Sequence, residues 1–325
     1  MRRGKISEIA LKRSVLKNIK IRNDKVIRGA DLSNDACEIR LEDVTVVMSS
    51  NCIETWFEGC IEFNIVKGMN NIYVQGAIPF ATEVVITLPL EYEEKQLGKL
   101  MRKLDEAFGK YNVQISGGHT SVSANVNQPI IMFTIIGRKC YNVNNLKNVK
   151  AGQQIVMTKS IAVGGTGIIS NTKEDLLKEK FINTYVDKCK DIINFISVEN
   201  EARVALEYGD VALHDISTGG VFAGVWELTS ASGLGVKIEL QKIPVWQETV
   251  EVSEVFDINP YLLDGTGSLL IVTNEGERLA DTLKENGINA SVIGTITSDK
   301  DRVLINGDET RFLEPQRGDE IYKLF

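Results

Sequence analysis

The spacing of apolar and polar residues over the first 140 positions predicts one mixed sheet covered by helices. Apolar residues recur every three or four positions in two segments, and alternate with polar residues or form short runs in four others. The resulting order, strand–helix–strand–helix–strand–strand, is typical of an α+β domain. The predicted helices are 57–76 and about 92–110, and the predicted strands are 44–49, 82–88, 113–123 and 129–139.

A polar, asparagine-rich stretch at 141–152 predicts the linker to a second domain. We therefore expect an N-terminal domain over 1–145 and a C-terminal α/β domain over 150–325. The second half carries its own strand and helix patterns and a glycine turn. Strands are predicted at 153–160, 210–215, 235–240, 267–273 and 291–297, the turn at 162–167, and helices within 175–208 and over 219–231 and 276–286.

Two adjacent asparagines, Asn70 and Asn71, interrupt the apolar pattern of the first predicted helix. An asparagine amide competes for backbone hydrogen bonds, so the residue is poor inside a helix. Neighbouring positions also point about 100° apart, so at most one of the pair can face the core squarely. The pair therefore indicates a requirement other than helix stability.

Composition and charge narrow the class of protein. The chain has 325 residues, of which 43% are hydrophobic and 25% charged, as expected for a globular protein of two domains. The net charge of −7 argues against nucleic acid as the main partner. No apolar run approaches the roughly 20 residues of a membrane helix, and the N-terminus lacks a signal-peptide pattern. We expect a cytoplasmic protein without a membrane partner.

The five cysteines include no CxxC pair, so we expect reduced thiols rather than a disulfide or zinc framework. Three of them fall on predicted buried elements and should react slowly with alkylating reagents. These three are Cys37, Cys52 and Cys60.

Candidate chemistry gathers where predicted strands give way to loops. The two histidines, His119 and His214, each follow a predicted strand, and a histidine in such a place is either structural or part of a site. Before His119, "SGGH" (116–119) predicts a turn that needs positive φ, and its glycines would also let a ligand approach the backbone. Asp35, in "LSNDACEI", precedes a predicted strand, where a solvated turn is the default.

The segment "HDISTGG" (214–220) has two interpretations. Asp215 ends a strand, Ser217 or Thr218 can cap the next helix, and Gly219 and Gly220 would leave its first amides bare. Bare amides at a helix start bind anions, whereas the alternative is an ordinary capped helix. The turn "GGTG" (164–167) has the same two interpretations. No Walker A, GxSxG, HExxH or EF-hand motif is present.

Seven short motifs follow one another in the order of the aminoimidazole ribonucleotide (AIR) synthetase superfamily. The chain resembles this group from about residue 4 to 325, and is most similar to the AIR-synthase-related, hydrogenase-maturation-factor-like proteins. Related enzymes are thiamine-monophosphate kinase and selenophosphate synthetase. The motifs are "NDACEI", "MSSN", "GMNNIYVQGAIP", "ISGGHTSVS", "MTKSIAVGGTGI", "HDISTGGVFAGVWELTSASGLGVKI" and "GTGSLLIVT".

The resemblance implies an N-terminal α+β domain, a C-terminal α/β domain, and a homodimer whose N-terminal sheets close into a barrel. It also implies an ATP cleft lined mainly by the N-terminal domain, with Mg²⁺, for phosphoryl transfer. The nucleotide- and phosphate-binding positions carried over are Asp35, Asn51, Asn71, Gly117, Gly118, His119, Thr120, Asp215, Thr218, Gly219 and Gly220.

The chain departs from the family where carboxylates are expected. Relatives carry Asp at the positions of Asn51 and Asn71, so Asp35 and Asp215 remain as the candidate metal ligands, with the two asparagines as neutral oxygen donors. Each lost charge about 4 Å from a cation forfeits on the order of 4 kcal/mol at an effective dielectric of 20. Mg²⁺ binding is therefore in doubt at this site.

Three functional hypotheses follow. The first is an ATP-dependent, phosphoryl-activating enzyme with an unknown acceptor, and the second is a non-catalytic binding or scaffold homodimer with a degenerate metal site. The third is a transition-metal site formed by His119, His214 and Asp215. The chain ends "DEIYKLF", without the terminal cysteine used by the hydrogenase-maturation enzyme, so we do not expect it to make the hydrogenase cyanide ligand.

Overall fold

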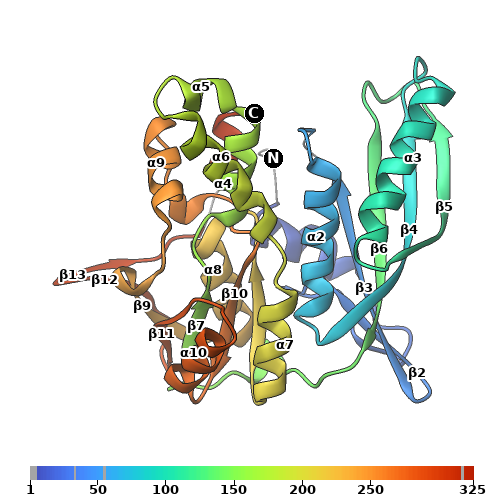
Figure 1. The fold of residues 1–325 in the computed structure, drawn as a ribbon. Helices are drawn as coiled ribbons and strands as arrows, with labels where there is room; N and C mark the ends of the chain where they lie inside the picture. The colour runs from blue at the N-terminus through green and yellow to red at the C-terminus, as the bar shows by residue number, and fades with distance from the viewer. Residues whose placement is uncertain (1–5, 33, 54–55, 316–317) are drawn as a thin grey trace. The chain divides into compact units, whose positions relative to one another are not determined.

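The computed structural model describes residues 6–32, 34–53, 56–315 and 318–325, and the chain divides into two compact units (Figure 1). The N-terminal unit comprises residues 22–30 and 34–140. The C-terminal unit comprises the other described residues, so residues 6–21 belong to it although they come first in the chain. The expected linker at 141–152 falls at the beginning of the main segment of the C-terminal unit, which starts at Tyr141.

The N-terminal unit is built on a six-stranded sheet in the order β1-β2-β3-β6-β4-β5. All neighbours in this sheet are antiparallel except β4 and β5. The strand expected after Asp35 is β2, whereas β1 was not predicted. The elements are β1 (Val26–Arg28), β2 (Cys37–Leu41), β3 (Val44–Ile53), α2 (Cys60–Tyr73), β4 (Ala77–Leu88), α3 (Glu94–Gly109), β5 (Gln114–Val122) and β6 (Ile130–Lys139).

Helices α2 and α3 cover one face of this sheet and leave the other face open (Figure 1). Alternation along the strands sends Val47, Phe133 and Ile86 toward the helices, where they are almost fully buried. The open face carries apolar side chains such as Met132 and Val85, which are 47% and 40% exposed. Helix α2 is shorter than the predicted 57–76 because Gly59, at φ +87°, precedes its first turn.

The C-terminal unit contains a seven-stranded sheet in the order β13-β12-β9-β11-β7-β10-β8. Only β12 and β9 pair in parallel among the described strands, so the unit is mixed α+β, not the α/β arrangement expected. The strands are β7 (Gln154–Thr158), β8 (Ala212–Ile216), β9 (Gly235–Glu239), β10 (Ser268–Thr273), β11 (Ala290–Thr297), β12 (Arg302–Asn306) and β13 (Glu309–Phe312).

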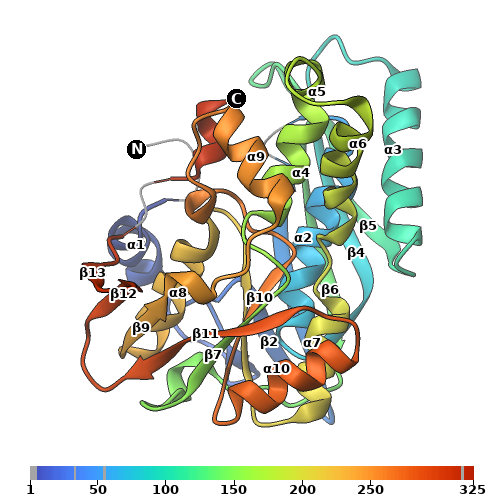
Figure 2. The same cartoon turned by 60° about the vertical axis from the view of Figure 1, so that its left-hand side comes forward.

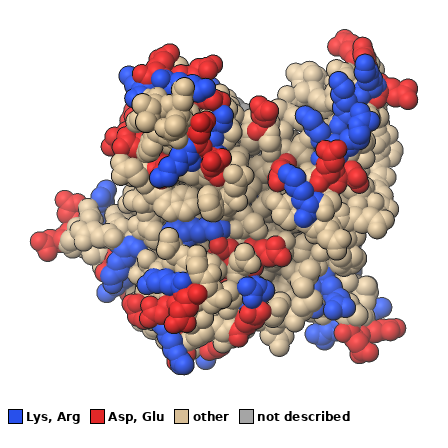
Figure 3. Space-filling model, in the orientation of Figure 1, with Lys and Arg blue, Asp and Glu red and all other residues tan. Residues whose placement is uncertain are grey.

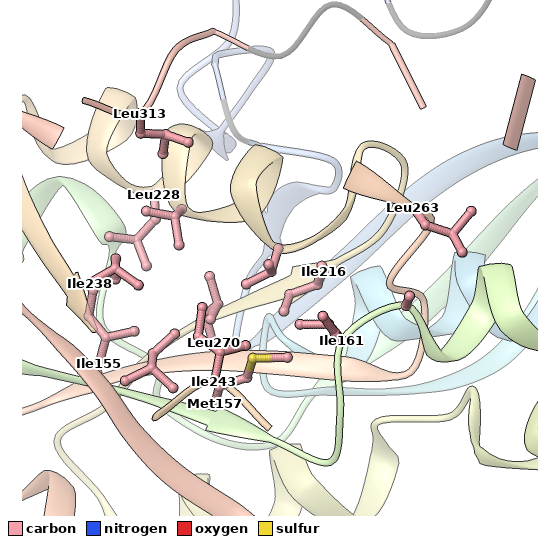
Figure 4. Close-up of a cluster of buried hydrophobic side chains, with 14 of the residues drawn as sticks. Ile155, Met157, Ile161, Ile216, Leu228, Ile238, Ile243, Leu263, Leu270 and Leu313 are labelled. Carbon is pink, nitrogen blue, oxygen red and sulfur yellow. The ribbon is translucent and has the colours of Figure 1, made fainter. Parts of the chain in front are cut away.

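Helices surround this sheet, and its core lies between the strands and α8 (Figures 2 and 4). Leu228 of α8 lies in one buried cluster with Ile155, Ile238 and Leu270 of the strands. The helices are α1 (Glu8–Ala10), α4 (Val163–Thr172), α5 (Glu174–Lys178), α6 (Asn183–Asp191), α7 (Glu199–Tyr208), α8 (Gly220–Ser232), α9 (Gln247–Val255) and α10 (Gly276–Glu285), with a 3-10 turn η4 (Ile192–Phe195).

A polar contact holds the first described residues on α8. The Glu8 carboxylate accepts hydrogen bonds from Trp226 Nε1 (2.9 Å) and Ser230 Oγ (3.2 Å). The Arg302 guanidinium lies 3.9 Å from the centre of the Trp226 ring and donates to Thr229 and Ser230. This contact explains why residues 6–21 group with the C-terminal unit.

Neither predicted glycine turn reverses the chain, although Gly118 has the expected positive φ (+145°) and "GGTG" lies at the start of a helix, as both interpretations of that segment required. Residues 116–119 lie inside β5, where Gly118 approaches β4 so closely that a Cβ would meet the Val84 carbonyl oxygen at 1.8 Å. Residues 163–167 lie inside α4, where a Cβ on Gly165 would meet Leu263 at 2.3 Å. In both places glycine permits close packing of neighbouring elements rather than a reversal of the chain.

In the described residues, no helix is both long enough and apolar enough to cross a membrane. Basic and acidic side chains are interspersed over the face shown in Figure 3. All five cysteines are free thiols. Of the three expected to be buried, Cys60 is buried, whereas Cys37 and Cys52 are partly exposed.

Thiol reactivity should separate the cysteines by burial. Burial raises the pKa of the Cys60 thiol and, together with Glu248, raises the pKa of Cys189 to about 11, so little thiolate forms at pH 8. Exposed Cys140 should react within minutes with a chromogenic disulfide, and Cys60 and Cys189 only after unfolding. Mass spectrometry of the labelled peptides identifies each thiol, and early labelling of Cys189 would contradict this assignment.

Candidate functional site

In the N-terminal unit, a chain of hydrogen bonds joins α2 to β3 and to the segment before β2. Asn71 Nδ2 donates to Ser49 Oγ (2.9 Å), and Ser49 Oγ donates to the Asp35 carbonyl oxygen (2.7 Å). Three sequence motifs far apart in the chain therefore meet at one point. Asn71 satisfies a buried polar group here, which accounts for its place inside an apolar helix pattern.

Asn51 lies two residues beyond Ser49, on the same face of β3. Its Nδ2 donates to the Asn64 carbonyl oxygen of α2 (3.0 Å), and its Oδ1 accepts from the Cys52 amide (2.9 Å). Both ends of the Asn51 amide are therefore engaged. Asn71 differs, because only its Nδ2 is engaged among the described residues and its Oδ1 is left available.

Of the carboxylates in this unit, Asp35 is the one whose position fits a ligand role. Its side chain is exposed and makes no hydrogen bond or ion pair with the described residues. No three His, Cys, Asp or Glu side chains of the described chain are grouped so as to hold a metal ion. Magnesium is commonly held by one or two carboxylates plus phosphates and water, so Asp35 and Asn71 Oδ1 fit only a metal that arrives with phosphate.

The glycine motif lies on the edge strand β5. Gly117, Gly118, His119 and Thr120 are all exposed. Strands β6 and β4 separate this motif from Asn51 on β3, a distance of about 14 Å at normal strand spacing. The sheet does not bring the motif into contact with the asparagines, so a ligand that touches both must be extended.

In the C-terminal unit, three loops converge at the start of α8. The Gly165 amide donates to the Asp264 carbonyl (2.7 Å), and the Gly265 amide donates to the Ser217 carbonyl (3.0 Å). A Cβ on Gly220 would meet the Tyr261 carbonyl oxygen at 2.5 Å. These contacts join the start of α4, the loop between β8 and α8, and the loop that precedes β10. The predicted residues Asp215, Thr218, Gly219 and Gly220 lie at this junction.

The predicted bare amides at the start of α8 are not bare. Asp319, from the C-terminal segment, accepts a hydrogen bond from the Gly219 amide (2.6 Å) and another from the Asp264 amide (3.2 Å). The Gly220 amide donates to the Ser217 carbonyl (3.1 Å), and the N-cap position is occupied by Gly219 rather than by Ser217 or Thr218. A carboxylate of the chain itself thus holds the position where an external anion was expected.

Sequence inspection missed Asp319 and Asp264, although both are about 95% buried next to this helix start. Asp319 lies 100 residues from Gly219 along the chain. An isolated acidic residue near the C-terminus has no local pattern to mark it. The one available signal was the "DGTG" at 264–267, which overlaps a motif already singled out.

The sequence had suggested that both histidines lie in strand-to-loop turns, but both lie inside strands. His214 is inside β8 and 4% exposed, and its Nε2 lies 3.2 Å from Glu227 Oε2 of α8. His119 is exposed within β5. The proposed transition-metal group with Asp215 has no support, because no three His, Cys, Asp or Glu residues of the described chain could together hold a metal ion.

Comparison with known proteins identifies the family. The model for the AIR synthase related protein N-terminal domain matches residues 44–139, and that for the C-terminal domain matches residues 150–306. The chain belongs to the AIR synthase related protein family. A relative from Methanocaldococcus jannaschii, named for hydrogenase expression and formation, is 25% identical over 319 residues, covering 93% of this chain and 91% of that protein.

Other members of the AIR synthase related family are similar along most of their length. The selenide, water dikinase of Treponema denticola is 22% identical over 260 residues, covering 78% of this chain and 70% of its own. HypE of E. coli, a hydrogenase maturation protein, shares the fold with a TM-score of 0.70 at 20% identity, over 92% of this chain and 95% of its own. ThiL complexed with AMPPCP and TMP shares the fold with a TM-score of 0.72 at 14% identity, over 96% of this chain and 98% of its own.

Asp319 should contribute measurably to stability as a remote cap of α8. Asp319→Ala should lower the free energy of unfolding by about 1–2 kcal/mol, because the Gly219 and Asp264 amides lose their acceptor. Asp281→Ala is the control, since Asp281 forms only an exposed pair with Lys284. Equal denaturation midpoints for the two variants in urea would rule out the capping role.

Proposed function

We propose that this member of the AIR synthase related family is an ATP-dependent enzyme that activates an acceptor by phosphoryl transfer. The observation that carries the proposal is the match to both family domains, in order, along the chain. Support comes from similar proteins that are named as a dikinase or were solved with ATP or AMPPCP. The acceptor is not identified by any of these similarities.

The nucleotide site proposed for the N-terminal unit centres on the hydrogen-bonded group of Asp35, Ser49 and Asn71. Asp35 offers a free carboxylate and Asn71 a free amide oxygen, so these two suit a metal ion carried by phosphates. The exposed backbone of Gly117 and Gly118, with Thr120, would contact another part of the same ligand, whereas His119 points to the other face of the sheet, beside Val85.

In the C-terminal unit, Asp215, Thr218, Gly219 and Gly220 remain the proposed phosphate-facing residues. Because the Gly219 amide already donates to Asp319, phosphate would have to be bound by other groups of this loop. The chain itself would position phosphates and exclude water, as in other phosphoryl transfers where geometry and electrostatics supply most of the catalysis.

A non-catalytic binding role is the second candidate. It is favoured by the amides at Asn51 and Asn71, which provide oxygen without the charge that metal-assisted transfer uses. The free carboxylate of Asp35 favours the enzyme instead. Calorimetry with ATP, with and without Mg²⁺, followed by an assay of ATP hydrolysis, separates the two roles.

We also propose a homodimer formed through the open face of the N-terminal sheet. Along one row of this face, His119, Val85, Met132 and Cys52 lie side by side on four strands. Ile130 on the same face is 39% exposed, and an apolar face of this kind commonly marks a protein–protein interface. The edge strand β5 would also gain protection from aggregation if covered in a dimer.

Restoring a charge at Asn71 should reveal whether the metal position is inherited. Asn71→Asp should tighten Mg²⁺–ATP binding about tenfold, or roughly 1.4 kcal/mol, and should weaken ATP binding without metal because a new anion faces the phosphates. Calorimetry measures both. Asn51→Asp is less suitable because it would place a carboxylate oxygen against the Asn64 carbonyl, to which Asn51 Nδ2 now donates.

The matched control is Asn112→Asp, which adds the same charge at an exposed turn with φ +55°, a conformation that Asp also tolerates. It should leave both affinities unchanged. A folded Asn71→Asp protein with no magnesium-dependent gain would show that Asn71 is a packing residue only. The same gain in Asn112→Asp would attribute the effect to net charge.

The dimer is tested by light scattering on a chain of 36.0 kDa. The wild type should have twice this mass at micromolar concentration, and Met132→Glu should give the monomer because it places a charge in the apolar face. Leu90→Glu, at an exposed turn outside this face, should remain dimeric. A monomeric wild type would exclude this assembly.

A further inference from the structure

Four oxygen atoms of the C-terminal unit converge on the side-chain nitrogen of Lys159, at the end of β7. Lys159 Nζ donates to the carbonyls of Phe195 (2.9 Å), Ser197 (2.5 Å) and Gly267 (2.9 Å). It also lies 2.9 Å from Glu201 Oε1, in the first turn of α7. The carbonyls belong to the segment between η4 and α7 and to the loop before β10. One point in the structure is therefore within hydrogen-bonding distance of all four oxygens.

These oxygens need a positive charge between them. All four are acceptors with partial or full negative charge, and Glu201 is only 4% exposed, so water screens their repulsion weakly. A neutral amine would turn its lone pair toward one of the oxygens, whereas an ammonium has three N–H donors and no acceptor. The geometry therefore requires the charged form of Lys159.

The backbone around this point is fixed by contacts that do not involve the ammonium. The Lys159 amide donates to the Asn289 carbonyl (2.7 Å), and Ser268 Oγ donates to the Ser160 carbonyl (2.5 Å). Ser268 directly follows Gly267, so the Gly267 carbonyl is tied to the end of β7 independently of the Lys159 side chain. The position of the oxygens is thus set partly by the fold itself.

The distances suit a large monovalent cation. Mg²⁺ binds oxygen at about 2.0–2.1 Å and Ca²⁺ at about 2.3–2.6 Å, shorter than three of the four distances here. K⁺ is similar in size to an ammonium group, and backbone carbonyls can replace its hydration shell. We propose that the oxygens of Phe195, Ser197, Gly267 and Glu201 form a monovalent-cation site, which Lys159 occupies with its own ammonium.

A tethered cation cannot dissociate, so the segments that it joins should stay together whatever salt is dissolved. Gly267 belongs to the loop in which the Gly265 amide donates to the Ser217 carbonyl (3.0 Å), next to the start of α8. The ammonium therefore also helps to position this loop. The inference concerns how the loop is held, and it does not depend on nucleotide binding.

Emptying the site tests the proposal. Lys159→Gly removes the ammonium, leaves room for a dissolved cation and suits the backbone, which has φ +54°. It should lower Tm by about 5–15 °C, because Glu201 and the carbonyls are left buried without their cation. Adding KCl at about 200 mM should raise the Tm of this variant by about 5 °C relative to the same concentration of tetramethylammonium chloride, whose cation is too large for the site.

Lys159→Met is the matched control. It also loses the ammonium, but its terminal methyl group would lie near the position of lysine Cε, too close to the Nζ position for a cation to fit there. Its Tm should fall and should be equal in the two salts, and so should the unreduced Tm of the wild type. Equal Tm values of Lys159→Gly in the two salts would overturn the proposal, as would the same K⁺-dependent gain in Lys159→Met or in the wild type.

A measurement on the unaltered protein decides the question if Lys159→Gly does not fold. A buried ammonium held by several acceptors exchanges its protons slowly, so ¹H–¹⁵N NMR at neutral pH should show an NH₃⁺ signal for Lys159. The ¹⁵N chemical shift of this group should be that of a charged amine and should be unaltered by KCl. The shift of a neutral amine would show that no cation occupies the site, and would overturn the proposal.

Discussion

The buried ammonium of Lys159 is the interaction on which the site of the C-terminal unit depends. Its Nζ donates to the carbonyls of Phe195 (2.9 Å), Ser197 (2.5 Å) and Gly267 (2.9 Å), and pairs with Glu201 (2.9 Å). Burial lowers the pKa of Lys159, and Glu201 opposes that effect. Lys159 also has φ +54°, a strained conformation that costs on the order of 1–2 kcal/mol. The end of β7, the segment after η4 and the start of β10 are thereby held at one point.

Loops held this firmly can approach one another closely, and glycine is required where they do. A Cβ would meet neighbouring atoms at 2.3–2.5 Å at Gly165, Gly220 and Gly265, all three in segments that resemble phosphate-binding motifs. Phosphate binding and backbone packing both exclude a side chain, so the glycines alone cannot distinguish the two roles. The neighbouring acceptor distinguishes them, and here Asp319 holds the amide that a phosphate would use.

The contrast between local and distant contacts explains how much the sequence could predict. Strong periodicity predicted α2, α3, α8 and most strands of both sheets, because burying one face of an element is a local property of the chain. The same reasoning failed for the "SGGH" and "GGTG" segments, whose glycines respond to Val84 and Leu263 on other elements. The cap by Asp319 and the attachment of Glu8 to α8 join residues 100 and more than 200 positions apart, beyond any pattern of spacing.

The two asparagines each have a hydrogen-bonding role that a carboxylate could not fill in the same way. Each donates an N–H to an oxygen of the protein, Asn51 to the Asn64 carbonyl and Asn71 to Ser49. A carboxylate has no N–H to donate, so an acid at either position would face an acceptor without a proton. Ser49 could turn its hydroxyl toward an acid at 71, whereas the Asn64 carbonyl has no such freedom. Both ends of the amide at 51 are therefore held by the protein, whereas the amide at 71 keeps an oxygen that no described residue engages.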